Sequence, residues 1–314
     1  MLIWLLKELL LNALQPDNLG RTATHIAANM CSLHAFQSLH ECRQLCFDPA
    51  EDGATPLHIA ARLDCIDAVK LLLAAGHPTH VADSQGSSPL HVAAMEQSVN
   101  VLNLLVLHGN IDGHDSDGAS PLMICVGKGL LEVVESLLKS GANAAHRNYS
   151  GRSCLHIMLL QLPHEQTHQF ILQNKIAVML LKYGIDVNAR DIDGCTPCHI
   201  AAKAGNIQML KYFMDNGGDV TITDLSGRSC LVQLNRENFH YVTQILIDRI
   251  KIPSSSDQEV LPSLCIPIAT MIMSFQLTLH SLCSQAHLRA VVEDGQLVYV
   301  KNIIMITDIF LAHQ

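Results

Sequence analysis

Residues 52–76 read DGATPLHIAARLDCIDAVKLLLAAG, and this stretch decides the fold of the chain. It holds two short apolar segments, residues 56–61 and 68–73, between a turn at Asp52-Gly53 and a closing Gly76. Thr55 is placed to cap the first helix, and Pro56 stands at the first helical position, where its missing N–H costs nothing. Helices of about ten residues are too short to persist alone in water. The unit must therefore pack against copies of itself.

The copies are present at a regular interval. The turn glycine recurs with spacings of 33, 33, 32, 33, 43 and 33 residues, as Gly20, Gly53, Gly86, Gly118, Gly151, Gly194 and Gly227. A variant of the same start follows each glycine, for example SSPLHVAA at 87–94 and CTPCHIAA at 195–202. This pattern resembles the ankyrin repeat, a 33-residue unit of a turn and two helices with a T-P-L-H-x-A signature. The resemblance covers about residues 1–250. It implies an all-α solenoid of stacked helix-turn-helix repeats with short β-hairpin or turn fingers.

The repeats set the predicted domain organisation. A half repeat occupies residues 1–17, and seven repeats start near 18, 51, 84, 116, 149, 192 and 225. The fifth repeat carries an insertion near residues 161–173, between its two helices. The serine-rich residues 251–259 read as a linker. Residues 260–314 form a tail that we expect to be helical or poorly ordered.

Composition restricts the function. The net charge is −9 and only 16% of residues are charged, so the chain lacks the basic surface that nucleic-acid binding requires. The eleven cysteines are not spaced as in a disulfide-rich scaffold, which favours a reducing compartment. We therefore expect a cytoplasmic or nuclear protein. The N-terminal apolar run carries Lys7 and Glu8 in its middle, which argues against a signal peptide. No cofactor is expected.

Two short motifs invite catalytic readings that their context does not support. His164-Glu165-Gln166-Thr167-His168 matches HExxH, the pattern of a zinc protease, but Pro163 precedes it and it lies in the insertion of a repeat. We interpret it as a surface loop or an extended helix, with no metal site. Cys195 and Cys198 form a CxxC, but Cys198 occupies the leucine position of the repeat and is expected to be a small buried hydrophobe. The chain is therefore predicted not to be an enzyme.

Histidine is abundant, with eighteen residues, and five of them occupy the same position of the repeat signature: His25, His58, His91, His156 and His199. In the ankyrin family this side chain bonds to the backbone around the turn and ties neighbouring repeats together. The resemblance therefore implies a structural role for all five.

The tail carries two further hypotheses. Residues 278–283 read TLHSLC and are followed by Leu288-Arg289, which resembles the opening of a SOCS box. That resemblance implies a substrate-recognition subunit of a cullin-type ubiquitin ligase that binds elongin and cullin components through 278–289. No L-P-L-P follows, and the spacing is one residue too long. Residues 264–283 are long enough to span a membrane, but Pro267 and interspersed polar residues make membrane tethering the weaker alternative.

The leading prediction is a non-catalytic scaffold or adaptor that binds a partner protein on the concave surface, formed by the turn tips and the exposed face of each first helix. Aromatic residues and arginines carry most interface energy. The predicted partner-binding residues are Arg62, Met95, Glu96, Lys128, Tyr149, Arg152, Ile192, Lys203 and Arg228.

Two finer hypotheses concern this surface. The early turn tips, such as Asp52 and Asp117, lean acidic and the later ones apolar, which suggests a partner segment with a basic end and a hydrophobic end. Asn188, in LLKYGIDVNARD, resembles the sites of the asparagine hydroxylase that modifies ankyrin repeats, with Leu180 eight residues before it. We therefore expect Asn188 to be a modification site.

Overall fold

The computed structural model describes residues 13–162, 167–234, 238, 242 and 245. The chain divides into two compact units, residues 1–261 and 262–314, and every described residue belongs to the first. Most of the predicted half repeat and the whole of the linker and the tail lie outside the described residues. Their boundaries stay predictions.

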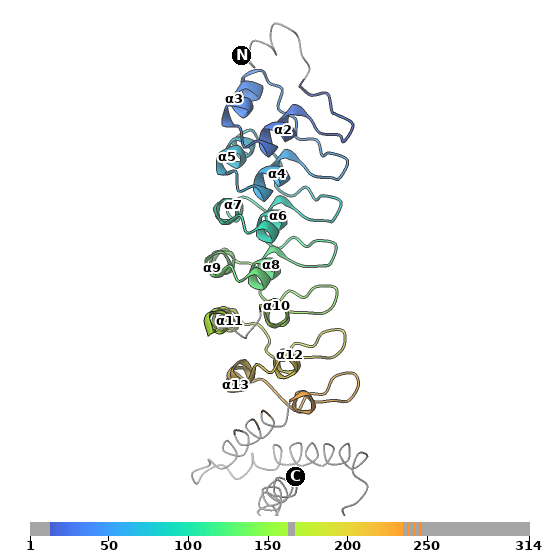
Figure 1. Cartoon of the computed structure of the whole chain (residues 1–314), viewed down its shortest axis with the longest axis vertical. Helices are drawn as coiled ribbons and strands as arrows, with labels where there is room; N and C mark the ends of the chain where they lie inside the picture. Colours follow the sequence, from blue (N-terminus) through green and yellow to red (C-terminus); the bar gives the residue numbers. More distant parts are fainter. Residues whose placement is uncertain (1–12, 163–166, 235–237, 239–241, 243–244, 246–314) are drawn as a thin grey trace, which may run out of the picture. The chain divides into compact units, whose positions relative to one another are not determined.

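The described residues form twelve α-helices arranged as pairs that stack along the chain (Figure 1). In each pair a short inner helix is followed by an outer helix, and a long turn, called here a finger, precedes the next pair. The inner helices are α2 (Ala23–Asn29), α4 (Pro56–Arg62), α6 (Pro89–Glu96), α8 (Pro121–Lys128), α10 (Cys154–Gln161) and α12 (Pro197–Lys203). The outer helices are α3 (Leu33–Glu41), α5 (Ile66–Ala74), α7 (Val99–Leu105), α9 (Leu131–Lys139), α11 (Thr167–Lys182) and α13 (Ile207–Asp215), and a 3₁₀ turn, η1 (Cys230–Gln233), opens repeat seven.

The core runs along the array, between successive inner helices and their outer partners. The leucine of the signature is buried in each regular repeat, as Leu57 and Leu90 show with 0% and 2% exposure. The small pairs that follow it, such as Ala60-Ala61, are fully buried, and they allow the inner helices to approach closely. The prediction of an all-α solenoid is confirmed.

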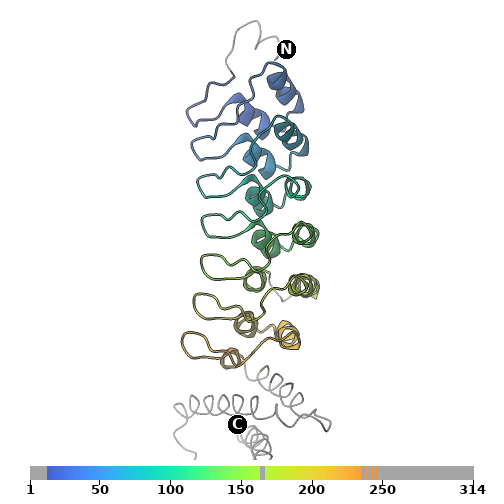
Figure 2. The ribbon, with the colours of Figure 1, turned by 180° about the vertical axis from the view of Figure 1, so that it is seen from behind.

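The fingers project from the inner helices on the side opposite the outer helices (Figure 2). They are turns rather than β-hairpins: among the described residues there is one isolated β-bridge, between Thr223 and Ser229, and no strand. Neighbouring fingers bond through their backbones, for example from the N–H of Ser84 to the C=O of Asp52 at 2.9 Å. A Cβ on Gly53, whose φ is +78°, would lie 2.7 Å from that same nitrogen. The glycine is therefore required both by the turn and by the spacing of the fingers.

The signature histidines link one finger to the next. His58 Nδ1 accepts the backbone N–H of Thr55 at 3.0 Å, and its Nε2–H donates to the C=O of Ser87 at 2.9 Å. The other four make the same pair of contacts in their own repeats. The predicted structural role of the five histidines is confirmed.

The insertion of repeat five lengthens an outer helix. α11 has 16 residues, whereas α5, α9 and α13 have nine. Gln173, which is 1% exposed, donates to the C=O of Leu162 at 2.6 Å and accepts from the amide of Asn206 at 2.9 Å. The extension is thereby fixed to repeat six. Residues 163–166 lie outside the described residues.

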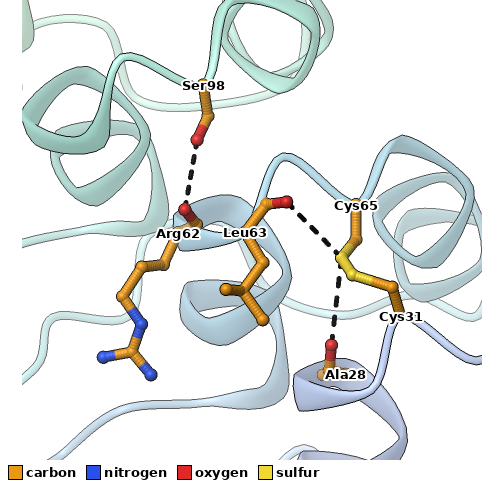
Figure 3. Close-up of a disulfide and its surroundings, with 6 residues drawn as sticks. All are labelled: Ala28, Cys31, Arg62, Leu63, Cys65 and Ser98. Atoms are coloured by element: carbon orange, nitrogen blue, oxygen red, sulfur yellow. Dashed lines mark hydrogen bonds between the residues drawn. A yellow bond between two sulfur atoms is a disulfide. The ribbon is translucent and has the colours of Figure 1, made fainter.

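A disulfide joins Cys31 of repeat one to Cys65 of repeat two, with the Cα atoms 5.6 Å apart (Figure 3). It connects the two short links between inner and outer helices, and Cys65 is 8% exposed. The spacing of the cysteines did not predict this bond. The other described cysteines are free thiols.

Candidate partner-binding site

A groove of about 660 Å³ lies on the concave surface of repeats three to five. Fingers form one of its walls and the inner helices α6, α8 and α10 form its floor. Four predicted partner-binding residues line it, namely Met95, Lys128, Tyr149 and Arg152. The remaining lining residues are Asp115, Ser116, Asp117, Ala119, Met123, Ile124, Asn148, Ser150, Ile157 and Gln161.

The floor of the groove depends on a position of α8 that carries no side chain. Gly127 occupies the position that Met95 holds in α6 and Leu160 holds in α10. A Cβ on Gly127 would contact the amide end of Gln161 and would lie 3.1 Å from Ile157 Cγ2. The absence of that Cβ leaves room for the Gln161 side chain on the floor of the groove.

Tyr149 stands at the finger tip of repeat five with 68% of its surface exposed. Its ring lies against Gly118 of the preceding finger, where an added Cβ would be 2.7 Å from Tyr149 Cδ1. The ring of His114 meets it edge-on, with centroids 6.2 Å apart. The aromatic side chain is thus positioned by its neighbours before any partner arrives, which lowers the entropy lost on binding.

In six of the seven fingers a short polar side chain three residues before the turn glycine holds the base of the finger, and repeat two has Ala50 there. Asp115 Oδ1 accepts the N–H groups of Asp117 and Ala119 at 3.0 and 2.8 Å. Asn148 Oδ1 does the same for Ser150 and Arg152 at 3.1 and 3.0 Å. Five of the seven fingers carry aspartate here, so Asn148 is an exception.

Repeat four also departs from the signature. Met123 stands in the histidine position and is buried in the floor of the groove. Its finger is instead contacted from the next repeat, because His146 Nε2–H donates to the C=O of Gly118 at 2.8 Å. The fingers on both sides of the groove are therefore linked in a way that differs from the rest of the array.

The other predicted partner-binding residues lie outside the groove. Arg62, Glu96 and Lys203 are exposed at the ends of α4, α6 and α12, and Ile192 is 61% exposed at a finger tip. Arg228 is already paired, since its Nε donates to Asp224 Oδ2 at 3.0 Å. The structure brings four of the nine together, and their use by a partner stays a prediction.

Asn188 is half-buried and bonds across to repeat six. Its amide nitrogen donates to the C=O of Gly217 at 2.9 Å, and its Oδ1 accepts the N–H of Asp219 at 2.8 Å. These bonds give the side chain a structural role. Its hydroxylation stays a prediction.

The described parts of the CxxC and HExxH motifs show no arrangement that would support redox chemistry or metal binding. Cys198 is fully buried, and burial raises the pKa of its thiol to about 12. His164 and Glu165 lie outside the described residues, and α11 begins at Thr167. Within the described ranges no cluster of three or more histidine, cysteine, aspartate or glutamate side chains is placed to hold a metal.

Comparison with known proteins identifies the class. The family model for ankyrin repeats in three copies matches residues 2–81 and 75–148, and that for ankyrin repeats in many copies matches residues 173–214. Together these ranges cover more than half of the chain, which therefore belongs to the ankyrin repeat family. Such repeats generally mediate protein–protein interaction and are generally not enzymes.

The most similar curated proteins include two from Fowlpox virus. The ankyrin repeat protein FPV244 is 30% identical over 158 residues, which is 41% of this chain and 23% of that protein. FPV219 is 38% identical over 91 residues, 27% of this chain and 20% of that protein. The matches thus span about a fifth to a quarter of these relatives.

Among solved structures, the ankyrin repeat domain of Bcl-3, a member of the IkappaB protein family, superposes with a TM-score of 0.61. The match covers 72% of this chain and 99% of that domain at 22% identity, and so supports the fold alone. No helix in the described part of the chain is long and apolar enough to cross a membrane. Residues 264–283 and 278–289 lie outside that part.

Proposed function

We propose that the chain is a non-catalytic scaffold or adaptor that holds a segment of a partner protein in the groove of repeats three to five. The observation that carries the proposal is Tyr149, an exposed aromatic ring fixed in place at the rim of a hollow. Interface energy concentrates in such aromatic anchors when they lie beside a pocket.

The surface on either side of the groove supports a long binding site. The tips of repeats five, six and seven carry Tyr149, Ile192 and Leu225, with 68%, 61% and 76% of their surfaces exposed. Asp52 and Asp117 lie at the tips of repeats two and four. A partner with a basic end over the acidic tips and an apolar end over the later ones would match this surface.

The test is affinity capture with the full chain from cell extract, followed by quantitative mass spectrometry. The groove variants are Tyr149→Ala, which removes the anchor, and Gly127→Leu, which displaces Gln161 from the floor. Leu107→Ala is the matched control, since Leu107 is 73% exposed after the outer helix α7. Loss of an anchor worth about 2 kcal/mol weakens binding roughly thirtyfold.

We expect one set of captured proteins to disappear with both groove variants and to remain with the control. An unchanged set with both groove variants would overturn the proposal. Charge reversal at Asp52 and Asp117 then tests the basic end of the partner, which should bind more weakly and with less dependence on salt.

A further inference from the structure

Three fingers carry an arginine directly after the turn glycine, in repeats one, five and seven. In repeat one, Arg21 Nε and Nη2 donate to Asp17 Oδ2 at 2.9 and 2.8 Å. In repeat seven, Arg228 Nε lies 3.0 Å and Nη2 2.9 Å from Asp224 Oδ2. In both repeats the guanidinium is thus satisfied by the aspartate that holds the base of its own finger.

Repeat five breaks this arrangement. The residue at the aspartate position is Asn148, and its single acceptor oxygen is already used by the backbone N–H groups of Ser150 and Arg152. Arg152 Nε is shielded from solvent and has no hydrogen-bond partner. Within the described residues no carboxylate lies within 4.0 Å of the Arg152 guanidinium. A partly buried cation without an acceptor is costly, and an incoming carboxylate would remove that cost.

The surroundings of Arg152 define what could bind there. Lys128, also in the groove lining, adds a second positive charge, and Tyr149 offers an apolar ring at the rim. Asp115 and Asp117 line the same groove, so its formal charges sum to zero. Asp115 is 9% exposed and its Oδ1 is occupied by its own turn. A doubly charged phosphate would be repelled strongly by these two carboxylates. A singly charged carboxylate is repelled less and can pair with Arg152.

We infer that the groove recognises an aspartate or glutamate side chain of the partner segment, bound by Arg152 with Lys128, next to an apolar side chain packed on Tyr149. The inference rests on the proposed function and names the chemistry of the partner. Asn148 acts as the specificity switch of the finger, because it holds the turn as aspartate does and yet leaves the arginine available.

The experiment measures binding of acetylated, amidated decapeptide pools to the immobilised full chain. In every pool one central position is leucine, and the next is glutamate, glutamine, lysine or phosphoserine, with the remaining positions mixed. The variants are Arg152→Gln, which removes the cation, and Asn148→Asp, which keeps the cation but gives it an internal carboxylate. Asp17→Asn is the matched control, since it makes the same exchange in reverse in repeat one, away from the groove.

We expect the wild-type chain and Asp17→Asn to bind the glutamate pool about tenfold more tightly than the glutamine pool, which corresponds to about 1.4 kcal/mol. Both groove variants should lose that preference. Equal binding of the two pools by the wild type, stronger binding of the phosphoserine or lysine pool, or a preference that survives in Asn148→Asp would overturn the inference.

The outcomes also separate the inference from the proposed function. If the pools bind equally and Tyr149→Ala weakens all of them, the groove binds partners but does not read a carboxylate. If no pool binds above background, the groove fails as a peptide site and the inference falls with the proposal.

Discussion

The junction between repeats two and three and the junction between repeats four and five use different contacts for the same task. At the first, His58 joins its own N-cap to the finger of the next repeat. At the second, Met123 has replaced the histidine, and His146 bonds back to Gly118 instead. Asn148 replaces the usual aspartate on the same finger.

The difference shows where the array is specialised. The contacts that set the spacing of the fingers repeat through most of the chain, and they are a property of the fold. Departures from the repeat's own pattern gather at the groove: Met123, Gly127 and Asn148 all line it or shape it. The residues that a repeat protein changes against its own consensus are therefore the ones to test for binding.

The largest expected effect concerns a third junction, between repeats one and two, which adds a covalent bond. The Cys31–Cys65 disulfide closes a loop with a sequence separation of 34. Closing such a loop lowers the entropy of the unfolded chain by an amount worth about 3 to 4 kcal/mol. We expect Cys31→Ser with Cys65→Ser to destabilise repeat one by that amount, with faster amide hydrogen exchange in α2 and α3. The free Cys42, mutated to serine, is the control.

Alkylation gives the decisive check of that expectation. Mass spectrometry after iodoacetamide treatment without reductant should leave both residues unmodified. Labelling of both would mean that the bond does not form in solution. Cys31 is exposed and therefore open to reductants.

The next effect compares the two finger linkages directly. His58→Met places the residue of repeat four in repeat two. It leaves the N–H of Thr55 without a partner and removes one of the two hydrogen bonds that the C=O of Ser87 accepts, the other coming from the N–H of Asp83 at 2.9 Å. A buried unsatisfied N–H costs about 1 to 3 kcal/mol and a lost hydrogen bond about 1 kcal/mol, so we expect a loss of about 2 to 3 kcal/mol in urea unfolding. His146→Ala removes one hydrogen bond at a partly exposed site and should cost about 1 kcal/mol. Equal losses would show that the two junctions are equivalent.

Much of the fold could be predicted from the sequence, because the residues that mark turns and helix starts recur at the spacing of the repeats. The glycine, the N-cap, the proline and the histidine of each repeat are a few residues apart and fix a turn and a helix start by local chemistry. The same locality explains why Cys198 was correctly placed in the core: it takes the leucine position.

The rest depended on contacts between residues that are far apart in the sequence. The two cysteines of the disulfide are 34 residues apart, one more than the repeat length. They therefore do not occupy equivalent positions in their repeats, and the repeat pattern does not pair them. Partner-binding residues could be placed on the concave surface, but the floor of the groove depends on Gln161 taking the space that Gly127 of the preceding repeat leaves open. Asn148 carried a readable signal, since five other fingers have aspartate, but its meaning emerged only from the unpaired Arg152 Nε.

The last effect is a response to acid, smallest at any one of the five signature histidines, that should spare the junction of repeats four and five. Burial lowers the pKa of the five signature histidines below 6.5, and it lowers that of His77 to about 4. The unfolded chain therefore binds more protons than the folded chain below pH 6.5, and stability is lost as the pH falls through that value. His77 alone should contribute about 2 kcal/mol of that loss at pH 5, a share that His77→Gln removes.

The measurement that separates the junctions is amide hydrogen exchange at pH 7 and pH 5, corrected for the intrinsic rates. A protonated Nδ1 can no longer accept a hydrogen bond, so the amides of Thr22, Thr55, Ser88, Ser153 and Thr196 should lose protection in acid. The helix cap of repeat four has no histidine, because Met123 occupies that position. There the N–H of Met123 donates to Ser120 Oγ, an acceptor that does not titrate. Protection at Met123 should stay constant. If it fell in parallel with the five amides, acid would be loosening the whole array rather than its histidine-linked fingers.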